Sequence, residues 1–545
     1  MDNLLINYSF STLLLFFPSL VMFAIDHNTV SLSGFQIPVA LLVLFTVTSV
    51  VQWTLKFSKK YPPGPMGIPF FGNLFQLSKQ GLNQWGHIYG DMAYLKVFGQ
   101  GILLINSHTA AIDLLHRRST IYSDRPSFVV INALTRGLFL GVLSYGDVWR
   151  KFRRGGHESM SKGAMGRYHK LQEREALIFT ENLLKDSSDW HQEVSRMTIS
   201  MLLSTVYDLP ATISKDDPII AKFNRFDNLL IEAAFPGNYL VEFFHWIKFL
   251  PSFIVPWKKR MADGYVEFSA FFEKLWNDTA KQVDAGEEKP GIAGYILRER
   301  QKLGFTEAQA AWLPATYANG SASITEVMLW FFLAMVAFPE QQKRCQDELD
   351  AVVGRSRMPT ASDAENLPYM KALVKEVLRW RPVSPLGTQH VVKQDDWYEG
   401  RFIPKGTMCF ANIWLMNRDK TVYGEDADEF NPGRFLDKDG NFVDIVGKTK
   451  DGYLESEGHV AYGFGARICP GRYYANEALL IVFSRLLWAA TIKPGINAST
   501  GKSTIPDLRE TVGAGITMRP PNFDIMVQRR FDEAPALLLQ TKELL

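Results

Sequence analysis

Residues 461–471, AYGFGARICPG, constrain this chain more than any other segment, because they set Cys469 in a Gly-x-Arg-x-Cys-x-Gly frame. A thiolate stays ionised as a metal ligand where positive charge and amide donors surround it. Arg467 can supply the charge, and Gly465 and Gly471 let backbone N–H groups approach the sulfur and any group bound there. The frame predicts a thiolate ligand for iron. An inert buried cysteine in a glycine-rich turn is the alternative for this loop taken alone.

Three further motifs precede the cysteine in the chain. Glu376 and Arg379, in KEVLRWRP, stand three residues apart and share one face of a predicted helix. Arg434 lies in FNPGRF, a Phe-x-Pro-x-Arg-Phe pattern. Trp149 stands four residues before Arg153 in DVWRKFRR. Each motif alone indicates little, since exposed ion pairs at helical spacing are common.

Together the four motifs resemble those of the cytochrome P-450 superfamily, in the order in which that family carries them. The resemblance implies one haem b, iron protoporphyrin IX, with the Cys469 thiolate as its axial ligand. A thiolate ligand favours O–O cleavage on iron. The resemblance also implies that Glu376, Arg379 and Arg434 form a buried charge network behind the haem.

The same resemblance implies which other side chains contact the haem. Those expected to hold its propionate groups are Trp149, Arg153, His390 and Arg467. For His390, in PLGTQHVVKQ, a histidine satisfied within a strand is an equal alternative. Tyr462 stands seven residues before the cysteine, where the family usually has phenylalanine. Its ring would lie against the haem, and its hydroxyl would need a hydrogen-bond partner.

The segment expected over the haem departs from the family pattern. The family places a glycine, an acid and an alcohol there to relay protons to bound dioxygen, and the matching stretch is ANGSASITE, residues 318–326. Gly320 takes the place of the glycine, Ala322 that of the acid and Ser323 that of the alcohol. Ala322 carries no proton, whereas Ser323 can donate and accept. Glu326 could contribute, although a helix charge paired elsewhere is the commoner role.

Two uncharged apolar segments precede all of these motifs. Residues 37–55 are long enough, as a helix, to cross a hydrocarbon core of about 30 Å, so we expect a transmembrane helix there. Residues 4–25 could form a second span, a signal-like segment or an interfacial helix. Lys56, Lys59 and Lys60 come next, and the positive-inside tendency places them and everything downstream on the cytosolic side.

We therefore divide the chain into an N-terminal membrane anchor of one or two spans at 1–60, a proline-rich neck at 61–73 and one catalytic domain at 74–545. The neck, YPPGPMGIPFFGN, is expected to be stiff and non-helical, because its prolines fix φ and lack a donor. It resembles the hinge of endoplasmic-reticulum members of the family, which implies the endoplasmic reticulum membrane. No Pro/Gly/Ser linker, charge run or repeat divides the remainder.

Composition excludes several other classes of protein. The net charge of +2 and the charged fraction of 21% exclude a strongly basic nucleic-acid binder. The chain has 3 cysteines, Cys345, Cys409 and Cys469, without paired spacing. This argues against a disulfide scaffold and a structural zinc site.

The pattern along the chain predicts a mainly α fold with a small β-rich lobe, which agrees with the cytochrome P-450 fold that the resemblance implies. Residues 93–107 alternate around a glycine turn and predict a hairpin, and residues 391–414 predict short strands. Residues 324–338 and 369–380 are periodic stretches that predict buried helices.

The runs KEVLRWRPVSPLG and IPKGTMCFANIWLMNRD resemble fungal microsomal members of secondary metabolism, in particular those similar to O-methylsterigmatocystin oxidoreductase. The resemblance implies a monooxygenase that hydroxylates or otherwise oxidises a lipophilic small molecule with O2. The family's substrate-contact segments correspond to residues 127–140, 232–249, 383–388 and 512–517, which are largely apolar. Core packing is the alternative for such apolar segments.

Electrons would come from a partner, NADPH-cytochrome P-450 reductase, because the chain shows no glycine-rich FMN or NADPH module. Arg150, Lys151 and Arg154 could attract an acidic face of that reductase. A second hypothesis is a haem-thiolate isomerase or dehydratase, or a non-catalytic haem protein, none of which needs the usual proton relay. The acid missing at Ala322 is the observation behind it.

Overall fold

The computed structural model describes residues 43, 46–47, 60–68, 70–77, 85–234, 238–444, 457–496, 501, 503, 505–514 and 517–544. The chain divides into two compact units, Met1–Lys60 and Tyr61–Leu545. The predicted anchor segments, 4–25 and 37–55, fall outside the described residues except for residues 43, 46 and 47, which are helical. The second unit contains all four motifs that the sequence singles out.

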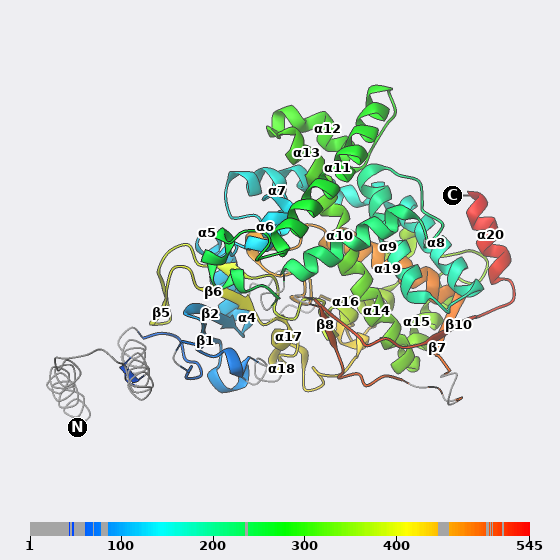
Figure 1. The fold of residues 1–545 in the computed structure, drawn as a ribbon. Helices are drawn as coiled ribbons and strands as arrows, with labels where there is room; N and C mark the ends of the chain where they lie inside the picture. Colours follow the sequence, from blue (N-terminus) through cyan, green and yellow to red (C-terminus); the bar gives the residue numbers. More distant parts are fainter. Residues whose placement is uncertain are drawn as a thin grey trace, which may run out of the picture. The chain divides into compact units, whose positions relative to one another are not determined.

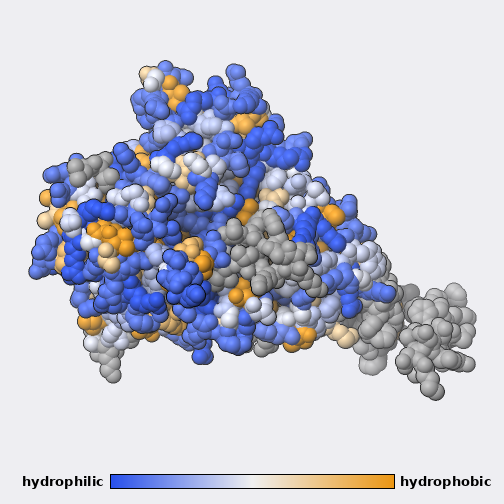
Figure 2. Space-filling model, turned by 180° about the vertical axis from the view of Figure 1, so that it is seen from behind, coloured by the Kyte–Doolittle hydropathy of each residue, from blue (hydrophilic) through white to orange (hydrophobic). Residues whose placement is uncertain are grey.

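This unit is mainly helical with small sheets, as the sequence pattern predicts, and the helices lie to one side of β1, β2 and β6 (Figure 1). The longer helices are α7 (Asp147–Met160), α8 (His169–Lys185), α9 (Trp190–Tyr207), α10 (Pro218–Ala234), α11 (Trp257–Asp284), α12 (Ile292–Leu303), α13 (Glu307–Ala318), α14 (Ser321–Ala337), α15 (Pro339–Val352), α16 (Pro368–Trp380), α19 (Arg472–Ala489) and α20 (Ala534–Leu544). The shorter ones are α4 (His108–Ala111), α5 (Ser119–Tyr122), α6 (Val129–Thr135), α17 (Ile413–Met416) and α18 (Lys420–Tyr423). Figure 2 shows a largely hydrophilic face with small, separate apolar patches.

The main sheet has four strands in the order β1-β2-β6-β3. Its strands are β1 (Met92–Val97), β2 (Gln100–Ile105), β3 (His390–Val391) and β6 (Met408–Ala411). β1 and β2 pair antiparallel with Met92 opposite Ile105, which confirms the predicted hairpin, and β2 pairs parallel with β6. The two-stranded sheets pair β4 (Asp396–Tyr398) with β5 (Arg401–Ile403), β7 (Ala490–Pro494) with β10 (Ile525–Arg529), and β8 (Val512–Ala514) with β9 (Thr517–Arg519).

The proline-rich neck lies along β1 without forming a helix. Tyr61 stacks on Tyr94 with ring centroids 5.0 Å apart. The Tyr94 amide donates to the Pro63 carbonyl at 2.7 Å, and the Asn73 side-chain oxygen accepts from the Lys96 amide at 2.9 Å. These contacts tie the neck to the sheet, so the chain enters the unit at a defined place.

From residue 327 to 336 the helix α14 passes through the core, because its residues there are apolar on every side. The ring of Phe331 stacks on that of Phe483 in α19 with centroids 3.8 Å apart, and Trp330 donates to the Met518 carbonyl at 3.0 Å. Among the described residues, the stretch Glu307–Ala337 is long and apolar enough to cross a membrane, yet 67% of its apolar window is buried in the protein. These contacts are those of a core helix.

A break at Asn319 and Gly320 separates α13 from α14. The Gly320 amide donates to the Tyr317 carbonyl at 3.0 Å, and the Ala322 amide donates to the Asn319 carbonyl at 3.3 Å. Both are i to i+3 hydrogen bonds, which tighten the chain locally relative to an α-helix. The α-helical pattern then resumes, since the Ile324 amide donates to the Gly320 carbonyl at 3.3 Å.

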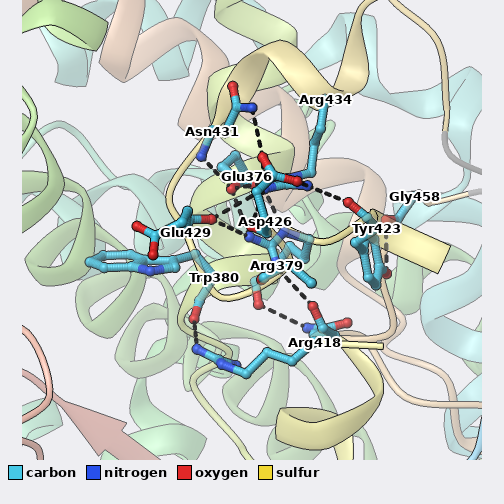
Figure 3. Close-up of polar contacts among 12 residues, drawn as sticks. Glu376, Arg379, Trp380, Arg418, Tyr423, Asp426, Glu429, Asn431, Arg434 and Gly458 are labelled. Atoms are coloured by element: carbon cyan, nitrogen blue, oxygen red, sulfur yellow. Dashed lines mark hydrogen bonds and ion pairs between the residues drawn. The ribbon is translucent and has the colours of Figure 1, made fainter. Parts of the chain in front are cut away.

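A buried charge network joins α16 to the segment around Arg434, as Figure 3 shows. Glu376 and Arg379 are both 0% exposed, and the Arg379 Nε atom lies 2.7 Å from a Glu376 carboxylate oxygen. The Arg434 Nε atom lies 3.2 Å from the same carboxylate. Arg434 also pairs with Asp426 at 3.1 Å. Two carboxylates, the buried one of Glu376 and the partly exposed one of Asp426, thus balance the two guanidinium groups.

Asn417 connects this network to the loop that carries Cys469. Its carbonyl accepts from Arg379 at 2.7 Å, and its side-chain amide donates to the Arg379 carbonyl at 3.1 Å. Its side-chain oxygen accepts from the Val460 amide at 3.0 Å. Val460 directly precedes the loop, so the charge network also holds the start of that loop.

We expect Glu376→Gln to lower the free energy of unfolding by about 3 kcal/mol or more, because Arg379 would remain buried without its counter-charge and Arg434 would keep only its pair with the partly exposed Asp426. Urea denaturation followed by circular dichroism measures this loss. The control is Asp278→Asn, which removes the exposed pair with Lys274 and should leave the urea midpoint nearly unchanged. Equal shifts of the midpoint in the two variants would contradict the role given to burial.

Candidate functional site

A cavity of about 390 Å³ lies between α7, α13, α14 and the loop before α19. It brings together most of the residues that the sequence predicted for the site. Those that line it are Trp149, Arg153, Gly320, Ser323, His390, Tyr462, Arg467, Cys469 and Gly471. Two predicted residues, Ala322 and Gly465, do not line it.

Gly465 shapes the Cys469 loop instead of lining the cavity. Its φ is +55°, and a Cβ atom there would lie 2.2 Å from the Leu115 carbonyl oxygen. Only glycine fits this conformation and this close approach. The Cys469 amide donates to the Tyr462 carbonyl at 2.9 Å, which closes the loop just before α19 begins.

Cys469 is surrounded by donors and positive charge. Burial raises the pKa of its thiol, while the Gly471 amide, Arg153 and Arg472 act in the opposite direction. A bound metal ion would deprotonate a thiol in such a position outright. The arrangement therefore suits a thiolate ligand, as the Gly-x-Arg-x-Cys-x-Gly frame predicts.

Arg467 is held by backbone carbonyls and by an aromatic ring. Its Nε atom donates to the Ser123 carbonyl at 2.8 Å, and its Nη2 atom donates to the Leu143 carbonyl at 2.6 Å. Its guanidinium carbon lies 4.6 Å from the ring centroid of Trp149. The guanidinium is thus fixed at the edge of the cavity.

Arg125 is a cavity residue that the sequence did not reveal. It is 8% exposed and donates to the carbonyls of Gly141, Thr388 and Gln389 at 3.1, 2.9 and 2.5 Å. Burial, together with the nearby charge of Arg467, lowers its pKa well below the usual value. No spacing relates it to the other motifs, so only the fold brings it to the site.

The three arginines of the cavity, Arg125, Arg153 and Arg467, leave positive charge without an ion-pair partner. None of them forms a salt bridge with a described residue, although Asp124 favours the charged state of Arg125 and Arg467. Burial and the neighbouring Arg153 lower the pKa of Arg467 to about 10. An anionic group in the cavity would relieve this repulsion, and the two propionates of a haem fit it.

Tyr317 of α13 supplies a further unsatisfied polar atom at this place. Its ring lines the cavity, and its buried hydroxyl has no hydrogen-bond partner among the described residues. This hydroxyl lies against the backbone of Gly156 in α7 and has almost no accessible surface, so it does not face the cavity. The Cys469 thiol and the three cations are therefore the features of the cavity that fit a haem.

One ring nitrogen of His390 has a hydrogen-bond partner within the protein. Its Nδ1 atom lies 2.7 Å from the Tyr122 carbonyl, so this nitrogen donates. Burial, with the charges of Arg125 and Arg467, lowers the pKa of the ring well below its usual value. The neutral ring then offers Nε2 only as an acceptor. His390 could donate to a propionate only after protonation, which a carboxylate in the cavity would favour.

Tyr462 finds the partner that its extra hydroxyl needs. The hydroxyl donates to the Asn476 side-chain oxygen at 3.0 Å, and the Asn476 amide donates to Glu457 at 2.9 Å. Glu457 in turn pairs with Lys375 at 2.7 Å. A polar chain thus runs from the cavity to charged residues on the other side of the Cys469 loop.

On the opposite side of the cavity, Asn319, Gly320 and Ser323 face inward from the helix break. Ala322 does not, so a side chain at that position meets the cavity only if the local backbone directs it there. Glu326 also lies outside the cavity lining. Burial raises its pKa to about 7, against the opposing charge of Arg519.

The remaining lining is largely apolar, from Phe139, Leu140, Leu202, Ile324, Val327 and Val383. Two of the predicted substrate segments, 127–140 and 383–388, therefore reach the cavity. The segment 232–249 instead lines a second cavity of about 170 Å³ beside Arg125. No described residue of 512–517 lines the main cavity.

Comparison with known proteins agrees with this site. A family model for Cytochrome P-450 matches residues 62–521. Cytochrome P-450 monooxygenase iboC of Amanita muscaria is 43% identical over 539 residues, which cover 91% of this chain and 96% of the relative. A cytochrome P-450 monooxygenase of Armillaria gallica is 41% identical over 515 residues, covering 92% and 97%. Cytochrome P-450 monooxygenase 58 of Postia placenta is 40% identical over 482 residues, covering 88% and 90%.

The family model covers the Trp149, Glu376, Arg434 and Cys469 motifs, and the relatives match the chain along nearly its whole length. Haem with a cysteine thiolate as axial ligand is the cofactor of this family, and the cavity contains the residues that such a group requires. The chain belongs to the cytochrome P-450 family, as a haem-thiolate monooxygenase.

Proposed function

We propose that this monooxygenase hydroxylates or otherwise oxidises a lipophilic small molecule in fungal secondary metabolism, with O2 and with electrons from NADPH-cytochrome P-450 reductase. The observation that carries the proposal is a single cavity that joins Cys469 and three arginines to an apolar lining under a broken helix. An apolar cavity with a few placed polar groups suits a lipophilic ligand. The relatives from Amanita, Armillaria and Postia are fungal monooxygenases, which supports the same class of reaction.

In this proposal the Cys469 thiolate would bind the haem iron. Arg125, Arg153, Arg467 and the Trp149 ring would hold the propionates. When bound, the haem supplies the activation of dioxygen, since its thiolate ligand favours O–O cleavage. The apolar lining orients the substrate and excludes water from the reacting atoms.

Ser323 has the distal role in proton delivery. Its hydroxyl lines the cavity and can both donate and accept, so it can hold a proton at Oγ beside the reacting oxygen. Ala322 offers no such group. The alternative of an isomerase, a dehydratase or a non-catalytic haem protein depends on that absence alone.

Basic side chains on α7 support a reductase partner. Arg150 and Arg154 are exposed, whereas Lys151 is half-buried and donates to the Gly304 carbonyl at 2.9 Å. Exposed positive charge steers an acidic partner surface to its docking site. Arg150 also pairs with the exposed Asp147 at 2.5 Å, so we assign this steering to Arg154 more than to Arg150 or Lys151.

Exposed aromatic side chains support association with the endoplasmic reticulum membrane. Phe70 of the neck and Phe244 both contact the ring of Phe98, with centroids 5.8 and 5.1 Å apart. Phe249 and Phe253, slightly later in the chain, are 78% and 82% exposed. Apolar surface of this kind suits an interface with lipid. We propose an anchor at 1–60, a neck at 61–73 and a cytosolic catalytic domain at 74–545.

Reduced protein saturated with carbon monoxide should show the red-shifted Soret band of thiolate ligation, and Cys469→Ser should abolish it. The reason is that Cys469 lines the cavity. Cys345→Ser and Cys409→Ser are the controls, because neither residue lines the cavity and both are buried elsewhere. Retention of the band in Cys469→Ser would refute the assignment of the ligand.

The cytosolic orientation predicts that native protein carries no N-linked glycan. Asn277 is exposed on α11 within an Asn-x-Thr sequon, and the sequon at Asn497 lies outside the described residues. Treatment of native membranes with an endoglycosidase should therefore cause no mobility shift. Protease added to intact microsomes should digest the domain. A glycan at either site, or a protected domain, would contradict this topology.

Reductase-dependent turnover with labelled dioxygen should place labelled oxygen in the product. Ser323→Ala should then lower the product formed per NADPH and raise peroxide release, since a positioned proton donor typically contributes about 10² to 10⁴ in rate. The dissociation constant for substrate should change little. Unlabelled product would refute monooxygenation, whereas unchanged product per NADPH would remove only Ser323 from the mechanism.

Ala322→Asp is the reciprocal variant of the same test. Ala322 does not line the cavity, so this variant acts only if the break at Asn319 and Gly320 lets an acid at 322 turn toward it. We expect more product per NADPH than in the wild-type protein. No improvement would indicate that residue 322 points away from the reacting oxygen even with the break.

A further inference from the structure

Asn319, at the break between α13 and α14, places a carboxamide group on the wall of the main cavity. Its nitrogen donates a hydrogen bond to the Oδ1 atom of Asp227 in α10, a residue that is 7% exposed and does not line the cavity. Its oxygen accepts from no described residue. The carboxamide is thus held by its nitrogen from outside the cavity, and its oxygen is left for a ligand.

We propose that Asn319 is a specificity-determining residue, which accepts a hydrogen bond from a hydroxyl or N–H group of the substrate, and that Asp227 is its positioning residue. This inference rests on the proposed function and deepens it, because it names the substrate class. The substrate is a lipophilic molecule that carries a hydrogen-bond donor, not a plain hydrocarbon. Asp227 acts through Asn319 and does not itself contact the substrate.

The helix break does not need the side chain of Asn319. The Asn319 backbone amide donates to the Ala315 carbonyl at 3.0 Å, and the Asn319 carbonyl accepts from the Ala322 amide at 3.3 Å. Both backbone groups therefore have partners within the chain segment itself. The side chain is free of any capping role, so its link to another helix serves a different purpose.

The link has a cost that a purely structural contact would avoid. Asp227 forms no ion pair with a described residue, and its one described hydrogen-bond partner is Asn319. Burying a carboxyl group without a cation is unfavourable, whereas an apolar side chain at 227 would pack without this cost. A carboxyl group keeps an acceptor oxygen in both protonation states, so it holds the nitrogen end of Asn319 in either state. What the acid provides is a fixed direction for the carboxamide.

Other polar groups on the cavity wall select a ligand less sharply. Ser323, Ser384 and Thr388 carry hydroxyl groups, which rotate and can either donate or accept. The Asn319 oxygen can only accept, and Asp227 fixes its direction. A ligand without a donor would leave this oxygen unpaired and would lose the hydrogen bond. The pair of Asn319 and Asp227 therefore favours a ligand that has a donor in the matching place.

Three phenylimidazoles test this role in the haem-loaded protein, without a reductase or a known substrate. Each binds ferric haem iron through an imidazole nitrogen and shifts the Soret band, so spectral titration gives its dissociation constant. N-phenylimidazole has no hydrogen-bond donor. Its isomer 4-phenylimidazole keeps a ring N–H group, and the para-hydroxyl derivative of N-phenylimidazole has an O–H group at the far end of the molecule. The two donor ligands thus present a donor at two different heights in the cavity.

Asn319→Ala should weaken the binding of at least one donor ligand by about 3- to 10-fold relative to N-phenylimidazole, which is the range expected for one hydrogen bond. Asp227→Leu should cause a smaller fall for the same ligand, because the carboxamide keeps its oxygen and loses its fixed direction. Asp227→Asn should retain part of the wild-type preference, since its side-chain oxygen can accept from the same nitrogen.

Asn224→Ala controls for a merely structural role. Asn224 lies one turn before Asp227 on α10 and accepts a hydrogen bond from Ser195 of α9 at 3.0 Å, so this variant also removes a contact between helices. It should lower the urea midpoint and leave the ratios of the dissociation constants unchanged.

Three results would overturn the proposal: unchanged ratios for both donor ligands in Asn319→Ala, an equal loss of affinity for all three ligands, or a fall confined to Ser323→Ala. The titrations depend on bound haem and not on turnover. Unlabelled product in the dioxygen experiment would refute monooxygenation and leave these ratios measurable. Unchanged ratios would refute the role of Asn319 even in a protein that forms labelled product, so the two failures are distinguishable.

Discussion

The positive charge gathered beside Cys469 is the constraint on which the rest of the site depends. Arg125, Arg153 and Arg467 come from three distant parts of the chain, and no described carboxylate forms an ion pair with any of them. Like charges held close together in a partly buried place repel one another and disfavour ionisation. An anionic cofactor removes that cost, so the same charge that strains the cavity favours the haem and the ionised Cys469.

The Glu376 network holds the chain just before the Cys469 loop. It satisfies every charge it buries, and through Asn417 it ties α16 to the residue that precedes the Cys469 loop. The two clusters therefore differ in kind. The charges of the network are neutralised within the protein, and the network stabilises the fold. The arginines of the cavity have no carboxylate partner among the described residues, so they can bind an anionic group.

The elements that could be predicted are those whose evidence is local. The hairpin of β1 and β2, the helices α14 and α16 and the turn around Cys469 each depend on residues within a short window. Arg125 could not be found in this way. Its place in the cavity depends on neighbours such as Gln389, far away in the sequence, which no spacing relates to it.

The amino-acid sequence by itself determined the family, the cofactor and the position of the thiolate, because these depend on residue types at fixed short spacings. It also determined that the acid of the family's distal segment is absent at Ala322. Only the tertiary structure decided that Arg125 joins the cavity and that Ala322 lies outside its lining. The physical reason is that burial and charge balance are properties of packed helices, and packing joins residues without regard to their separation along the chain.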